Sequence, residues 1–172
     1  MPIVPDTKNW TWVLEKPCPD CGYDSTATAF DEIPGYVREN VAAFRQVLSG
    51  EGLTMRPDDS TWSPLEYSAH VRDVYRIMLA RLELMLVLVD PQFPNWNQDA
   101  TAIEQHYNAQ DPSVVADELA TAGIAFADTL AQVHSGELGR MGFRGDGSAF
   151  TVESLAKYAL HDPIHHLWDV TK

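Results

Sequence analysis

Apolar residues recur at intervals of three and four positions in four separate stretches of the chain, a spacing typical of amphipathic helices. Turn-forming residues separate these stretches, and the predicted helices run over residues 31–49, 63–89, 111–135 and 151–170. No segment shows a convincing strand pattern. The sequence therefore predicts an all-α protein with the architecture of a four-helix bundle.

The segments outside these helices define the rest of the predicted organisation. Residues 91–110 form a long connection between the second and third helices, with room for a short helix over 99–108. Connections of this length are often functional, and this one could cover one end of the bundle. Residues 1–30 are irregular, and residues 144–148 form a turn. We therefore expect a single domain over 1–172, with an irregular N-terminal arm and a bundle over 31–170.

The second predicted helix has a strong start signal. Ser63 stands at the N-cap, Pro64 at the first helical position, and Glu66 completes a capping box. Further along, His70 shares one helical face with apolar residues such as Val74. A buried imidazole needs a hydrogen-bond partner or a metal, so His70 is a candidate ligand.

Three of the six histidines lie in the last predicted helix. His161 and His165 are four residues apart, so on a continuous helix they lie on the same face and can reach one metal ion. His70 is the best candidate for a third ligand, whereas His166 is rotated away from the pair and faces another helix or solvent. Taken alone, one such histidine pair is more often a surface or core feature than a metal site.

Pro163 lies between the two histidines and allows two interpretations of this segment. Inside a helix a proline removes one backbone hydrogen bond and costs roughly 3 kcal/mol. Asp162-Pro163 could instead begin a separate helix, which would spoil the stacking of the histidines. We favour a kinked but unbroken helix, because Tyr158 and Trp168 lie on the same side as the histidine pair.

The two cysteines, Cys18 and Cys21, form a single CxxC motif in the arm. A structural zinc site usually needs a second such pair or two histidines. A thioredoxin-like function would need a βαβ context, which this chain lacks. The pair could be a dithiol, a redox couple or half of a site completed by histidines distant in sequence. We assign it a local structural or redox role, outside the main chemistry.

Composition and charge narrow the functional classes. Of the 172 residues, 45% are hydrophobic and 22% are charged, as in ordinary folded proteins, and the net charge is −13. This acidic balance argues against non-specific binding to nucleic acid or to anionic membranes. The longest apolar run, residues 84–89, is far too short to span a bilayer, and residues 1–5 do not read as a secretion signal. We therefore expect a cytoplasmic location.

With these histidines, the chain resembles the DinB-like superfamily over residues 31–170. That group includes damage-inducible proteins of unknown activity, thiol-dependent S-transferases and the N-terminal domain of mycothiol-dependent maleylpyruvate isomerase. Its members take one metal ligand from the second helix and an H-x-x-x-H or E-x-x-x-H pair from the fourth. The corresponding positions in this chain are His70, His161 and His165. Actinobacterial members in particular are similar to the strings Trp62-Ser63-Pro64-Leu65-Glu66 and His161-Asp162-Pro163-Ile164-His165-His166. The CxxC arm lies outside the family pattern.

The resemblance implies a divalent metal, zinc or nickel, held by His70, His161 and His165 with open positions for water or substrate. Such a metal can lower the pKa of a bound thiol, which would give an S-transferase that joins a low-molecular-weight thiol such as mycothiol to a small-molecule substrate. This is the favoured interpretation. A metal that activates water would give a hydrolase instead, and a third interpretation is a non-enzymatic bundle with a structural or idle metal. The resemblance also implies a homodimer.

Six further residues are candidates for the surroundings of this site: Asp73, Asp162, Asp169, Arg81, Tyr67 and Tyr158. The aspartates could orient the histidines as hydrogen-bond acceptors, although for each one alone a solvated helix charge is the commoner case. The arginine shares the helical face of His70 and could hold an anionic substrate or pair with a buried carboxylate. The tyrosines could line the pocket, although such aromatic residues are more often simply core.

Overall fold

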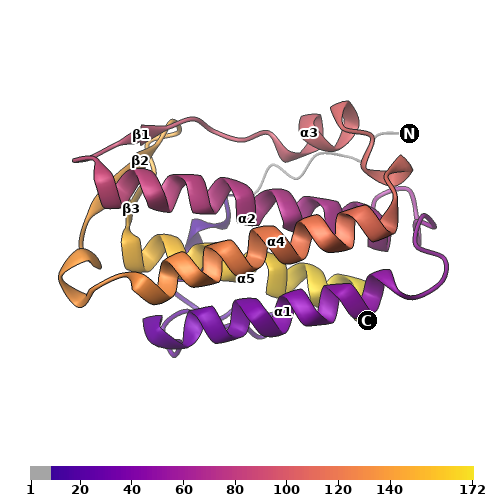
Figure 1. Cartoon of the computed structure of the whole chain (residues 1–172), viewed down its shortest axis with the longest axis horizontal. Coiled ribbons are helices and arrows are strands. Elements are labelled where there is room, and N and C mark those ends of the chain that lie inside the picture. Colours follow the sequence, from indigo (N-terminus) through magenta and orange to yellow (C-terminus); the bar gives the residue numbers. More distant parts are fainter. Residues whose placement is uncertain (1–8) are drawn as a thin grey trace.

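A computed structural model of the protein describes residues 9–172 and contains four long helices lying side by side (Figure 1). These helices follow the amphipathic stretches of the sequence and are α1 (Ile33–Leu48), α2 (Pro64–Val87), α4 (Pro112–Gln132) and α5 (Val152–Thr171). The predicted four-helix bundle is therefore confirmed. Residues 1–8, with the first part of the predicted arm and the expectation about a secretion signal, lie outside the described residues.

The helices share one core, because α1 and α2 each pack against both α4 and α5. Large buried side chains such as Phe44, Tyr75 and Phe126 fill this core. Gly123 on α4 allows a close approach to α1, since a Cβ atom there would lie 2.3 Å from Val41 Cγ2. A glycine at this position therefore lets the two helices pack more tightly than any other residue would.

The helix starts confirm the capping signals of the sequence. The Ser63 hydroxyl accepts a hydrogen bond from the Glu66 amide at 3.2 Å, and the Glu66 carboxylate accepts one from the Ser63 amide at 2.9 Å. Asp111 and Thr151 cap α4 and α5 in the same way, through side-chain oxygens that accept from amides of the first turn. These caps accept hydrogen bonds from first-turn amides that have no partner within their own helix.

A small sheet at one end of the bundle corrects the expectation that the chain contains no strands (Figure 1). Its strands are β1 (Gln92–Phe93), β2 (Met141–Arg144) and β3 (Ala149–Thr151), in that order. β1 pairs with β2 in parallel and β2 pairs with β3 antiparallel. Strands of two to four residues are too short for an alternating pattern to stand out, and the first pairing joins segments far apart in sequence.

The connection between α2 and α4 does contain the predicted short helix, as α3 (Gln98–Glu104), followed by the 3₁₀ turn η3 (Tyr107–Ala109). The predicted turn at residues 144–148 joins β2 to β3. Trp96, just before α3, stacks on the buried imidazole of His70, with ring centroids 5.2 Å apart and planes 6° apart. The connection therefore covers the part of α2 that carries the candidate ligand.

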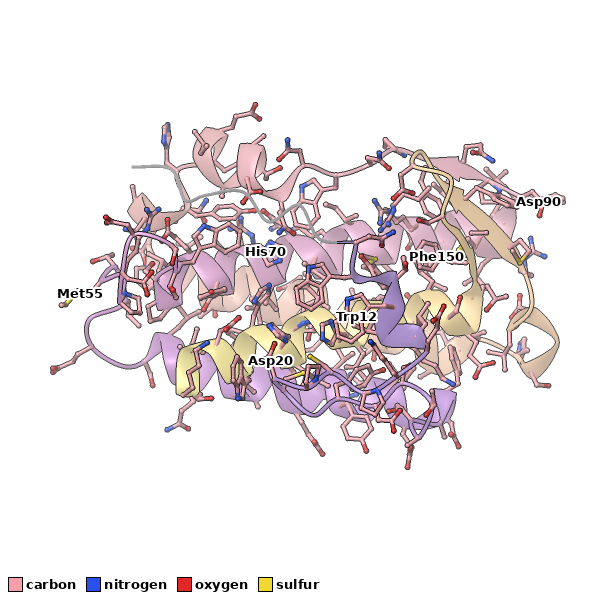
Figure 2. The ribbon with its side chains drawn as sticks, turned by 180° about the vertical axis from the view of Figure 1, so that it is seen from behind. Trp12, Asp20, Met55, His70, Asp90 and Phe150 are labelled. Atoms are coloured by element: carbon pink, nitrogen blue, oxygen red, sulfur yellow. The ribbon has the colours of Figure 1, made fainter. Side chains whose placement is uncertain are left out.

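The described part of the N-terminal arm folds back over α5 (Figure 2), where the stretch that carries Trp12 and Asp20 crosses the helix. It contains the 3₁₀ turn η1 (Trp10–Leu14) and then a turn around the CxxC motif. Val13 and Cys18 are both buried, so the arm belongs to the folded body. Within residues 9–172, every helix is too short or too polar to cross a bilayer.

Candidate functional site

The site is built around α5, which continues unbroken through Pro163 as the favoured interpretation required. On α1, the buried Asn40 donates a hydrogen bond to the Pro163 carbonyl at 2.9 Å. The rings of His161 and His165 lie one turn apart, with centroids 5.2 Å from each other and planes tilted by 44°. An unbroken helix also places a second i,i+4 pair, Asp162 and His166, on the neighbouring face.

His70, Asp162 and His166 form the first group of potential metal ligands, with ligand atoms that all lie within 4.8 Å of one another. Asp162 Oδ1 lies 3.1 Å from His70 Nε2 and 3.6 Å from His166 Nε2. The two imidazole rings are 4.9 Å apart and nearly perpendicular. Two imidazoles and one carboxylate, with positions left open, form a donor set found at catalytic zinc and non-haem iron sites.

Aromatic residues hold His70 in place. Its side chain is fully buried, between Trp96 on one side and Trp62, whose ring centroid is 5.2 Å away, on another. Its Nδ1 atom has no hydrogen-bond partner among the described residues. The polar contacts of this imidazole are therefore directed through Nε2 toward Asp162 and His166.

Asp169 orients the histidines of α5 from one turn further along the helix. His166 Nδ1 donates a hydrogen bond to Asp169 Oδ2 at 3.0 Å, which leaves the Nε2 lone pair facing Asp162. His165 Nε2 lies 3.8 Å from the same Asp169 oxygen. A carboxylate that accepts from the outer nitrogen of a histidine fixes its tautomer and increases its basicity toward a metal.

The charge state of the first group suits a cation. Burial raises the pKa of Asp162, but the His70 and His166 imidazoles outweigh it and hold that pKa well below its usual range. Burial also raises the pKa of Asp169, and its hydrogen bond from His166 lowers that pKa below the ordinary value. Both carboxylates are therefore ionised at neutral pH.

The second group consists of Cys18, Cys21, His161 and His165, again with ligand atoms within 4.8 Å of one another. Cys18 Sγ lies 3.5 Å from His165 Nδ1, and neither cysteine forms a disulfide. The Nε2 atom of His161 is buried without a hydrogen-bond partner among the described residues. Burial lowers the pKa of His161 to about 4, so its imidazole is neutral at neutral pH, the form that binds metals.

The structure does not bring the predicted triad of His70, His161 and His165 together, because its members are divided between these two groups. Successive residues of an α-helix point about 100° apart. The Asp162–His166 pair therefore faces α2, while the His161–His165 pair faces the arm. The signal for this arrangement was present in the sequence as a second i,i+4 pair, D-x-x-x-H, one residue along from the histidine pair.

A cavity of about 280 Å³ opens onto both groups. Aromatic, histidine and acidic side chains dominate its wall: Trp10, Trp62, Tyr67, Tyr158, His161, His165, His166, Asp20, Asp99, Asp162 and Asp169. No lysine or arginine lines it among the described residues. The cavity is therefore acidic and aromatic, suited to cations and to uncharged or cationic organic groups.

Two of the predicted surrounding residues lie elsewhere. Asp73 is buried in an ion network, in which it accepts hydrogen bonds from Arg72 at 2.9 Å and from Tyr107 at 2.5 Å. Arg81 donates to the Pro94 carbonyl at 3.0 Å and lies over the Phe93 ring. Neither residue lines the cavity. Arg81 is therefore a buried structural cation and not a substrate-binding residue, and its partners are a carbonyl and an aromatic ring where a carboxylate was expected.

Comparison with known sequences places this architecture in a family. The profile of the DinB superfamily matches residues 36–170. The chain belongs to the DinB superfamily. The matched region contains the whole His70–Asp162–His166 group, whereas Cys18 and Cys21 precede it. The second group therefore joins two histidines of the DinB domain to an arm outside the matched region.

Among solved structures, this DinB protein is similar to YfiT from Bacillus subtilis, described as a probable metal-dependent hydrolase with an unusual four-helix bundle topology. The two chains share 20% sequence identity with a TM-score of 0.75, and the similarity covers 83% of each. The likeness supports the four-helix fold. No curated protein matches the chain.

Proposed function

We propose that this DinB protein is a metal-dependent enzyme whose catalytic centre is the His70–Asp162–His166 group, and that it hydrolyses a small uncharged or cationic substrate. One observation supports this most strongly. Two imidazoles and a carboxylate converge from α2 and α5, and two of these groups, Asp162 and His166, line an aromatic cavity. Three protein ligands beside open space are typical of catalytic rather than structural metal sites.

The donor set fits a divalent ion of the zinc, nickel or iron type. His70 Nε2, His166 Nε2 and an Asp162 oxygen would hold the ion, in agreement with the 3.1 and 3.6 Å separations between these atoms. A divalent ion there would supply Lewis-acid activation of a small nucleophile, either water or a thiol.

The other side chains of the site prepare it for this chemistry. Asp169 holds His166 with its Nε2 lone pair directed toward the group. Trp62 and Trp96 enclose His70 and exclude water from that side. Asp99 adds a carboxylate to the cavity wall, which disfavours anionic substrates.

The size of the cavity favours water over a thiol as the nucleophile. A volume of about 280 Å³ lies at the lower end of the range for small-molecule sites. Hydrolysis needs room for one substrate and a water molecule, whereas S-transfer needs room for an acceptor and a complete thiol cofactor. The structurally similar YfiT, which is described as a probable metal-dependent hydrolase, is consistent with hydrolysis. Thiol-dependent S-transfer, the interpretation preferred from sequence, is the second candidate.

Paired assays on protein reconstituted with zinc, nickel or iron test this proposal. Hydrolysis is measured with 4-nitrophenyl acetate, and S-transfer with N-acetylcysteine and 1-chloro-2,4-dinitrobenzene. We expect thiol-independent ester hydrolysis that is lost with a chelator, restored by metal and lowered at least about 100-fold in His166→Ala. Asp128→Asn, which removes an exposed carboxylate on α4, is the matched control and should retain the activity.

The outcomes separate the interpretations. Conjugation that requires the thiol, with no hydrolysis, would replace the hydrolase by the S-transferase. Neither reaction in a metal-loaded protein would favour the non-enzymatic bundle. Activity that survives in His166→Ala would remove the catalytic assignment of this group.

A further inference from the structure

We propose that Cys18, Cys21, His161 and His165 form a structural zinc site that fastens the N-terminal arm to α5. This site is separate from the His70–Asp162–His166 group, and the inference does not depend on the proposed function. The two groups lie on adjacent faces of the same helix, because each takes an i,i+4 pair one residue apart from the other.

The geometry of the four side chains fits one zinc ion. At the usual Zn–S and Zn–N distances, the ligand atoms of a tetrahedral site lie roughly 3.3–3.8 Å apart. The four ligand atoms lie within 4.8 Å of one another, and Cys18 Sγ is 3.5 Å from His165 Nδ1. Small adjustments of the side chains would therefore close the site.

The unpartnered nitrogen of His161 is independent support. The residue is 4% exposed, and its Nε2 atom has no hydrogen-bond partner among the described residues. A buried polar atom without a partner costs on the order of 1–3 kcal/mol. A metal held by this nitrogen and by the cysteine sulfurs would satisfy it, whereas a disulfide between Cys18 and Cys21 would leave it unsatisfied.

The donor set indicates zinc and a structural role. Two thiolates and two imidazoles fill all four positions of a tetrahedral zinc, which leaves none for water or substrate. The backbone around the motif forms a compact turn, with hydrogen bonds from the Gly22 amide to the Cys18 carbonyl at 2.9 Å and from the Cys18 amide to the Tyr23 carbonyl at 2.8 Å. Gly22 adopts a positive φ of 75°, which glycine allows without steric cost, and the two cysteine sulfurs at this turn lie within 4.8 Å of each other.

The zinc would also shape the cavity of the first group. Trp10 packs on the rings of both His161 and His165, with centroids 5.4 and 5.3 Å away, and it lines the cavity together with Asp20. Figure 2 shows Asp20 and the arm in front of α5. Fastening the arm at the CxxC turn therefore holds one wall of the cavity in place.

Metal analysis of three forms of the full chain tests the site: the natural sequence, a Cys18→Ser/Cys21→Ser variant and a His70→Ala/His166→Ala variant. The cysteine variant should lose about one equivalent of zinc per chain, and the histidine variant should keep that equivalent. After replacement of zinc by cobalt, a thiolate-to-cobalt charge-transfer band should appear in the natural protein and in the histidine variant. It should be missing from the cysteine variant.

A second measurement on the natural sequence covers the case in which the cysteine variant does not fold. A strong chelator should expose two reactive thiols and should speed amide exchange over residues 10–30 by at least about tenfold. Zinc alone should reverse both effects. A chain isolated with an intramolecular disulfide, thiols that react equally with and without chelator, or a charge-transfer band that disappears in the histidine variant would each overturn the proposal.

Discussion

Replacement of Asp169 tests whether a carboxylate behind His166 controls metal binding at the first group. The Asp169 carboxylate accepts from His166 Nδ1 at 3.0 Å, and its side chain is only 11% exposed. Hydrogen bonds to charged groups contribute about 1.5–3 kcal/mol, and loss of such an outer partner typically lowers metal affinity about 10–100-fold. We therefore expect Asp169→Ala to weaken binding by close to 100-fold, equivalent to about 2.7 kcal/mol. Asp169→Asn, which keeps an acceptor but loses the charge, should weaken it about tenfold.

Competition with a chromophoric chelator measures this effect. The dissociation constant to follow is that of the more weakly bound zinc, because a site with two thiolates binds zinc more tightly than one with two imidazoles and a carboxylate. Lys172→Met is the matched control, since it removes another partner of Asp169, a half-exposed lysine 3.0 Å away. Because the lysine end of this ion pair is open to solvent, the pair contributes at most about 1 kcal/mol. Unchanged affinity in Asp169→Ala, or an equally large loss in Lys172→Met, would refute the reasoning.

Three further predictions concern the bundle. Gly123→Ala should lower the free energy of unfolding, measured in urea, by about 1–2 kcal/mol, because overpacking against Val41 outweighs the gain in helix propensity. A more stable variant would contradict the close packing of α1 on α4. Asp73→Asn should lower it by about 3 kcal/mol at pH 7, since it breaks a buried ion network. Burial raises the pKa of Asp73, but hydrogen bonds from Arg72 and Tyr107 hold it below its ordinary value. The stability from this carboxylate is thus present above about pH 4 and lost as the pH falls through the folded-state pKa. The free energies of unfolding of the natural protein and of the variant, plotted against pH, should therefore converge in acid. A constant difference between the two proteins would count against the network. The homodimer implied by family resemblance stays a prediction: light scattering after gel filtration should give twice the mass of one chain, and the mass of one chain would reject it.

The elements that could be predicted from the sequence are those with local signals. Ser63, Asp111 and Thr151 marked helix starts because their side chains cap amides only two or three residues away. The small sheet gave no such signal, since Gln92 pairs with Phe143 across a separation that includes all of α4. Short strands stabilised by non-local pairing carry no period that a single sequence reveals.

The candidate site was predicted only where its residues gave local signals in the sequence. Burial of His70 followed from the apolar face of its helix, and helical spacing gave the close approach of the His161 and His165 rings. Which face of α5 meets His70 depends on the rotation of the helix about its axis, which is set by packing against α1 and α2 and not by spacing. A rotation of one residue exchanges the His161–His165 pair for Asp162 and His166. The partner of the histidine pair, the CxxC arm, comes from more than 130 residues away in sequence.

Anomalous diffraction from crystals of the metal-loaded protein tests the central claim most directly, because it places each ion among its ligands. We expect one peak between His70, Asp162 and His166, and a second peak held by Cys18, Cys21, His161 and His165. A single peak coordinated by His70, His161 and His165, or no peak beside His70, would contradict it.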